Sequence, residues 1–154
     1  MIKQISYNDC IKKWGDPSGH GGVEQIQRDL VTIETSIIFR PSNTRSILCH
    51  KSIADDLYKT LSIVSDIYSP LEIEKYGLNI YGGCYVNRRT KNGKWWSVHT
   101  WGLAVDMATT LGQYGTTPAT PYLFTKVWLD MGWNWGGNWR GLRDGMHFSA
   151  VNEG

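Results

Sequence analysis

The strongest pattern in the sequence is an apolar stripe at helical spacing that runs from about Ser52 to Tyr68. Ser52 and Asp55 stand where a capping pair would begin such a helix. Apolar side chains then recur every three or four positions, at Ile53, Leu57, Leu61, Val64 and Tyr68. A helix with one apolar face must bury that face, so the fold needs a second layer to cover it, and we expect a sheet.

A second helix is predicted towards the end of the chain. Thr120 with Pro121 predicts its start, and Gly132 predicts its end just after Met131. Its expected buried face comprises Phe124, Val127, Trp128 and Met131.

Several short segments are typical of strands. One apolar-rich segment ends near Phe39, and the others cover residues 78–81, 102–108 and 146–151, while residues 41–46 are typical of a loop. We therefore predict an α+β fold in which a small antiparallel sheet packs against helices, as a single domain over residues 1–154.

Composition limits the possible partners. The chain has 16 Lys+Arg against 14 Asp+Glu, a net charge of +2 that gives no reason to expect nucleic acid binding. No apolar run is long enough for a signal peptide or a membrane span, so we expect synthesis in the cytoplasm and no membrane insertion. Cys10, Cys49 and Cys84 form no closely spaced pair, which favours free thiols. We expect a monomer.

The segment SVHTWGLAVDM places His99 and Asp106 seven residues apart. Seven residues span roughly 23 Å on a straight strand and roughly 10 Å along a helix. A zinc ion binds its ligands at roughly 2 Å, so neither element lets both side chains reach one ion. The two residues are therefore either unrelated or the ends of a turn, which Gly102 would permit.

His147 would complete a set of two imidazoles and one carboxylate. Three such ligands leave a fourth position open, as in catalytic zinc sites, where a bound water has a lowered pKa. Asp144, three residues before His147, is the natural general base. Each of these residues alone is more often a hydrogen-bonded structural residue, and no HExxH motif is present. His20 and His50 favour structural roles.

The chain resembles a known family at these residues. SVHTWGLAVD is similar to the motif SxHxxGxAxD, and DGMH is similar to [DE]xxH, the paired signatures of zinc D,D-peptidases related to the VanY carboxypeptidases. These enzymes share a fold with phage L-alanyl-D-glutamate peptidases and with the Hedgehog signalling domain. The segments GGCYVNRR and WNWGGNWRGLRDGMHF resemble the endolysin branch, as do WGDP and the helix after His50.

The resemblance implies a role for each matching residue. It makes His99, Asp106 and His147 the zinc ligands and Asp144 the general base. An arginine, Arg88 in preference to Arg89, would stabilise charge on the scissile carbonyl or hold a substrate carboxylate. Residues expected near the substrate are Ser97, Trp135 and Gly136.

The implied function is zinc-dependent hydrolysis of peptidoglycan stem peptides. We expect an L-alanyl-D-glutamate endopeptidase of the endolysin type, which lacks a signal peptide and reaches the cell wall after release from the host cytoplasm. One alternative is a D-alanyl-D-alanine carboxypeptidase. A second alternative is a non-catalytic phage structural or binding module stabilised by zinc, which would have no need of an unligated carboxylate at Asp144.

Overall fold

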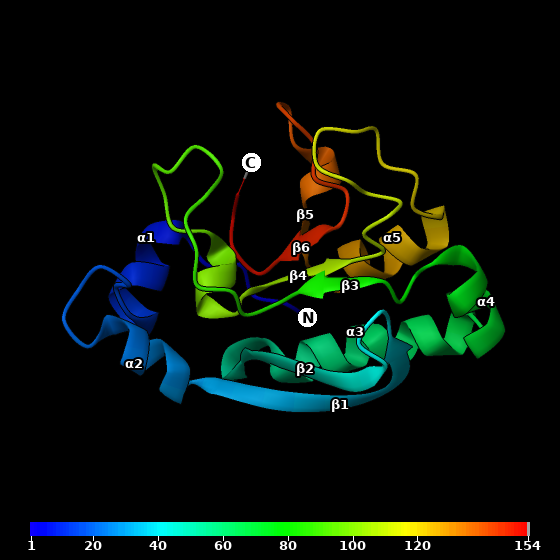
Figure 1. The fold of residues 1–154 in the computed structure, drawn as a ribbon, viewed down its shortest axis with the longest axis horizontal. Helices are drawn as coiled ribbons and strands as arrows, with labels where there is room; N and C mark the ends of the chain where they lie inside the picture. Colours follow the sequence, from blue (N-terminus) through cyan, green and yellow to red (C-terminus); the bar gives the residue numbers. More distant parts are fainter. Residues whose placement is uncertain (154) are drawn as a thin grey trace.

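The computed structural model describes residues 1–153, and Figure 1 shows antiparallel sheets flanked by helices. The first sheet is a hairpin of β1 (Leu30–Phe39) and β2 (Thr44–His50). The second sheet has four strands in the order β3-β4-β6-β5. These strands are β3 (Tyr81–Gly83), β4 (Ala104–Met107), β5 (Asn134–Trp135) and β6 (His147–Ser149). The predicted α+β class with a small antiparallel sheet is confirmed.

Both predicted helices are present. α3 (Ala54–Ile67) packs against β1 and against α5 (Tyr122–Asp130). Gly132, with a φ of +90°, follows α5, whose predicted face is buried except that Met131 is only half-buried. The shorter helical segments are α1 (Tyr7–Asp9), η1 (Cys10–Trp14), α2 (Gly22–Arg28), η2 (Lys51–Ile53), α4 (Pro70–Tyr76), η3 (Val98–Trp101) and η4 (Gly136–Asn138). Among residues 1–153, no helix has the length and apolar character to cross a membrane.

The predicted capping pair of the first long helix is wrong. The chain enters α3 through the 3-10 turn η2, so the capping position moves back to His50. The Nδ1 atom of His50 accepts a hydrogen bond from the amide of Ser52 at 3.1 Å. The Ser52 hydroxyl lies 2.7 Å from the same nitrogen, and Asp55 makes no capping bond. An imidazole at the end of β2 therefore begins the helix.

The strands predicted for residues 102–108 and 146–151 are present but shorter, as β4 and β6, and two further predicted boundaries also differ. The loop predicted for residues 41–46 is shorter, because β2 already begins at Thr44 and pairs with Phe39. The strand predicted for residues 78–81 begins only at Tyr81. Residues 77–79 instead complete the end of α4, where the Leu78 amide donates to the Ile73 carbonyl oxygen at 3.0 Å.

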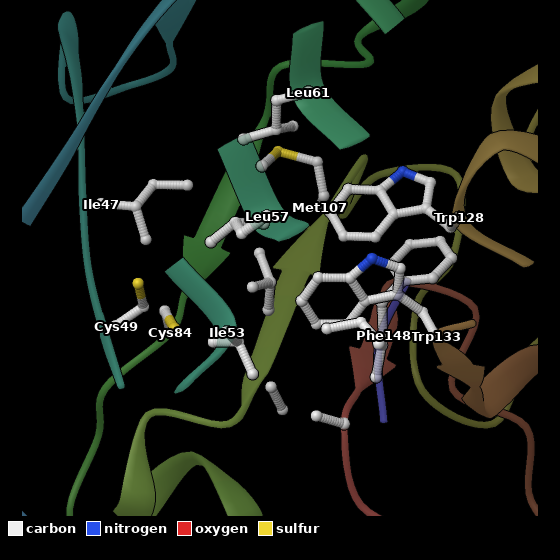
Figure 2. Packing of buried hydrophobic residues seen from close by; sticks show 14 of the residues in the cluster. Ile47, Cys49, Ile53, Leu57, Leu61, Cys84, Met107, Trp128, Trp133 and Phe148 are labelled. Carbon is white, nitrogen blue, oxygen red and sulfur yellow. The ribbon is translucent and has the colours of Figure 1, made fainter. Parts of the chain in front are cut away.

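The core lies between the four-stranded sheet and the two long helices (Figure 2). Trp128 of α5 stacks on Phe148 of β6 with ring centroids 4.3 Å apart. Phe148 pairs with Val105 across the strands, and the next pair is Asp106 with His147. Because side chains alternate between the faces of a strand, the side chains of Asp106 and His147 point to the opposite face of the sheet from Phe148 and Trp128. The predicted free thiols are confirmed, since the three cysteines are buried and unpaired.

Candidate metal centre and catalytic cleft

The turn between His99 and Asp106 is a 3-10 segment, a glycine and a strand. The Ser97 side chain accepts a hydrogen bond from the His99 amide at 3.3 Å and caps η3. Gly102 ends η3 with a φ of +68°, a conformation that favours glycine, and the chain then enters β4. A Cβ atom on Gly102 would also lie only 2.9 Å from the His50 amide nitrogen. His99 and Asp106 are therefore the two ends of a turn that reverses the chain at Gly102.

Three ligand atoms converge at this turn. The Oδ1 atom of Asp106 lies 3.2 Å from Nε2 of His99 and 3.3 Å from Nδ1 of His147. The candidate ligand atoms all lie within 4.8 Å of one another. Asp106 and His147 are register partners on β4 and β6, whereas His99 reaches the same point from η3. The structure therefore brings together the three residues that the sequence predicts as ligands.

The hydrogen bonds around the imidazoles fit a metal ion. The His99 Nδ1–H donates to the carbonyl oxygen of Cys84 at 2.8 Å, which leaves Nε2 as the nitrogen with a free lone pair. That Nε2 is buried and has no hydrogen-bond partner in the described chain. On His147, Nε2 lies 2.7 Å from Oε1 of Glu153, so Nδ1 faces Asp106. These residues could hold Zn²⁺ through two nitrogens and one carboxylate oxygen.

The charges of the site also suit a cation. Burial alone would raise the pKa of Asp106, but its contacts with His147 and His99 outweigh burial and hold that pKa well below its usual range. Burial alone would lower the pKa of His147, but its bonds to Asp106 and Glu153 raise it to about 10. Metal ions bind only the neutral imidazole, so a metal ion and a proton would compete for this nitrogen.

Asp144 lies beside the ligands without being one of them. Its amide donates to the Gly136 carbonyl oxygen at 3.0 Å, and its own carbonyl oxygen accepts from the His147 amide at 3.1 Å. Burial raises the pKa of its carboxyl group, with a further contribution from the charge of Asp106, while the charge of His147 acts in the opposite direction. Its Oδ1 atom is buried and makes no hydrogen bond to any described residue. Such a carboxylate is free to accept a proton.

A cleft of about 440 Å³ opens onto these groups. Arg88, Ser97, Tyr114 and Trp139 line it together with His99, Asp144 and His147. Two larger hollows, of about 680 and 540 Å³, lie elsewhere on the surface, but neither is lined by any of the three candidate metal ligands. We therefore place the candidate site in the smaller cleft.

The two predicted arginines lie in different surroundings. Arg88 lines the cleft, and its amide lies 3.3 Å from the Thr100 hydroxyl. The guanidinium of Arg89 instead stacks over the ring of Trp96, 3.9 Å from the ring centroid. Of the two predicted arginines, Arg88 therefore lines the cleft and Arg89 does not.

Of the other predicted substrate residues, one lines the cleft and two do not. Ser97 lines it. Trp135 lines two smaller neighbouring hollows, and its indole nitrogen donates to the Gly145 carbonyl oxygen at 2.8 Å. Gly136 is buried and packs directly against the main chain of Asp144.

Sequence reasoning missed six residues of the site, of which Thr90 and Asn92 line the cleft beside Arg88. Lys91, Tyr114 and Trp139 line the cleft, and Glu153 contacts His147. Trp139 belongs to the segment WNWGGNWRGLRDGMHF that carries the resemblance, but only Trp135 and Gly136 of that segment were individually predicted to lie near the substrate. Lys91, Tyr114 and Glu153 belong to no motif, so the sequence held no signal for them.

Comparison with known families supports this site. Residues 90–150 match a family model described as D-alanyl-D-alanine carboxypeptidase, and this segment contains the three candidate ligands and Asp144. No curated protein and no solved structure matches the chain, so the likeness to a Hedgehog-type fold stays a prediction. The segment that contains the three candidate metal ligands is thus similar to a family of metallopeptidases that act on peptidoglycan.

Proposed function

We propose that this protein is a zinc-dependent peptidase that hydrolyses the stem peptides of peptidoglycan. One observation carries the proposal: ligand atoms of His99, Asp106 and His147 converge within 4.8 Å, and Asp144, a half-buried carboxylate with a buried Oδ1 atom, lines the same cleft without belonging to the ligand set. Two imidazoles and a carboxylate are typical of catalytic zinc sites, and a separate carboxylate supplies the general base.

The residues of the chain divide the chemistry between them. A zinc ion in the site would supply a Lewis acid and lower the pKa of a water molecule. Asp144 would accept the proton of the attacking water and pass it to the departing amine. Arg88 would stabilise the negative charge that develops on the scissile carbonyl oxygen or hold a carboxylate of the peptide.

For the bond that is cut, we propose the L-alanyl-D-glutamate bond, as in phage endolysins. This choice is supported by the likeness of GGCYVNRR and WNWGGNWRGLRDGMHF to that branch. The protein would then be made in the host cytoplasm and reach the wall after release. A D-alanyl-D-alanine carboxypeptidase is the second candidate, favoured by the description of the matching family model. Both activities need the same ligands and base.

The arrangement around Asp144 argues against a purely structural zinc module. A structural site has no use for a partly buried, unligated carboxylate beside the metal, because burying such a group costs desolvation free energy and binds nothing. Asp144 lies in the cleft with one oxygen unpartnered in the described chain.

Digestion of purified peptidoglycan, followed by mass analysis of the new termini, tests the proposal. New N-terminal D-glutamate supports the endopeptidase, and loss of terminal D-alanine supports the carboxypeptidase. Chelation should abolish either activity and added Zn²⁺ should restore it. Unchanged peptidoglycan at saturating Zn²⁺ would exclude both activities.

A further inference from the structure

Glu153 contacts His147 on the edge of the imidazole ring that faces away from Asp106. Its Oε1 atom lies 2.7 Å from Nε2 of His147, on the side of the imidazole away from Asp106. The same oxygen lies 2.7 Å from the hydroxyl of Ser149, two residues after His147. The Glu153 side chain is 23% exposed, so the pair is largely shielded from water.

This contact decides which nitrogen of His147 can bind a metal. A carboxylate accepts hydrogen bonds, so the proton of the neutral imidazole must lie on Nε2 when Glu153 is ionised. The lone pair then lies on Nδ1, which is the nitrogen that faces Asp106 at 3.3 Å. The hydroxyl of Ser149 fixes the carboxylate in place for this task.

The two imidazoles of the site are oriented by different partners. The Nδ1–H of His99 donates to a neutral main-chain carbonyl, that of Cys84. Of the two ring nitrogens that face away from Asp106, only Nε2 of His147 has a charged partner. A hydrogen bond to a carboxylate is stronger than one to an amide and makes the ring a better electron donor. The loss of Glu153 should therefore weaken one specific ligand.

We propose that Glu153 is a positioning residue that holds His147 in its metal-binding tautomer and strengthens it as a ligand. The inference rests on the metal centre of the proposed function, and it assigns a role to a residue outside both metal motifs and outside the segment that matches the family model.

Zinc affinity, measured by competition with a chelator, tests this role without reference to activity. Glu153→Ala should raise the Kd for Zn²⁺ by about 10- to 100-fold, and Glu153→Gln, which can keep the hydrogen bond but not the charge, by about 10-fold. Glu34→Gln is the matched control, because Glu34 is exposed on β1, and it should leave the Kd unchanged. Far-ultraviolet circular dichroism of each zinc-free variant checks the fold.

Nitrogen-15 NMR of the zinc-loaded protein supplies a second readout. The wild type should show a slowly exchanging proton on Nε2 of His147, and Glu153→Ala should lose it. Absence of zinc binding by the wild type would overturn the proposed metal centre. Zinc binding by the wild type with a change of less than threefold in Glu153→Gln would overturn the role of Glu153 alone. Glu153→Gln decides the question even where Glu153→Ala fails to fold.

Discussion

Gly136 lies directly against the main chain of Asp144. The Asp144 amide donates to the Gly136 carbonyl oxygen at 3.0 Å. A Cβ atom at position 136 would lie 2.4 Å from the carbonyl oxygen of Asp144 and 3.1 Å from its Cβ. Real Cβ atoms do not approach a carbonyl oxygen this closely, so a side chain there must push Asp144 away.

Gly136→Ala should therefore lower kcat while leaving zinc in place. A displacement of about 1 Å at a catalytic group can cost about 100-fold in rate, and we expect a loss of at least about 10-fold. Zinc affinity should change less than kcat, because the three atoms nearest to the added Cβ all belong to Asp144 and none belongs to a ligand. Gly141→Ala is the control, since a Cβ atom there meets nothing within 4 Å. Equal kcat values for the two variants would contradict the supporting role of Gly136.

Substitutions at Asp144 and at His147 should have different effects on catalysis and on metal binding. Asp144→Ala should lower kcat by about 100- to 10,000-fold, the range for loss of a general base, and should still bind zinc. His147→Ala should lose activity and most of the zinc affinity, because it removes a ligand. Peptidoglycan turnover and zinc titration on the same preparations measure both effects. Full turnover by Asp144→Ala would show that another group acts as the base.

Arg88 and Arg89 offer a comparison between neighbouring residues. Arg88→Ala should reduce kcat/KM by about 100- to 1,000-fold, as for the loss of one donor to a developing oxyanion. Arg89→Ala should change kcat/KM by only a few fold, since its guanidinium stacks on Trp96 outside the cleft. Steady-state kinetics on a stem-peptide substrate distinguish the two. A larger loss for Arg89→Ala would reverse the assignment.

Patterns that repeat within one element were predictable from the sequence. The stripes of α3 and α5 and the strand-like segments that contain β4 and β6 each require only local spacing, and all were found. The metal ligands were predictable because the first motif spans the Gly102 turn and enters β4, and the second motif ends at His147, the first residue of β6. A further local signal was present but not used: Ser69 and Glu72 form a capping box, with Pro70 at the first turn of α4.

The remaining features depend on contacts between distant parts of the chain. His50 caps α3 only because β2 delivers it there, and nothing in the spacing of Ser52 and Asp55 reveals that position. Cys84 orients His99 through a main-chain carbonyl, which carries no side-chain signature. The separation of Arg88 from Arg89 likewise depends on where Trp96 lies.

His50 should make the stability of the protein depend on pH. Burial lowers the pKa of this fully buried imidazole from 6.5 to about 4. The charge of Asp29 opposes this shift, and the charges of Lys51 and Lys13 add to it. Between these pH values the unfolded chain takes up a proton that the folded protein excludes. The free energy of unfolding should therefore fall as the pH drops from about 6.5 to 4, by up to about 3 kcal/mol.

The capping bond gives a structural reason for this dependence. The Nδ1 atom of His50 accepts from the Ser52 amide, and a protonated imidazole cannot accept. His50→Asn should be less stable than the wild type at neutral pH, because it loses the ring contact with Trp14, 4.3 Å between centroids. Its unfolding free energy should nevertheless vary less between pH 6.5 and 4. Urea unfolding across this range measures both, with His20→Asn, at an exposed position, as the control. Parallel pH profiles for His50→Asn and the wild type would show that His50 is not the group responsible.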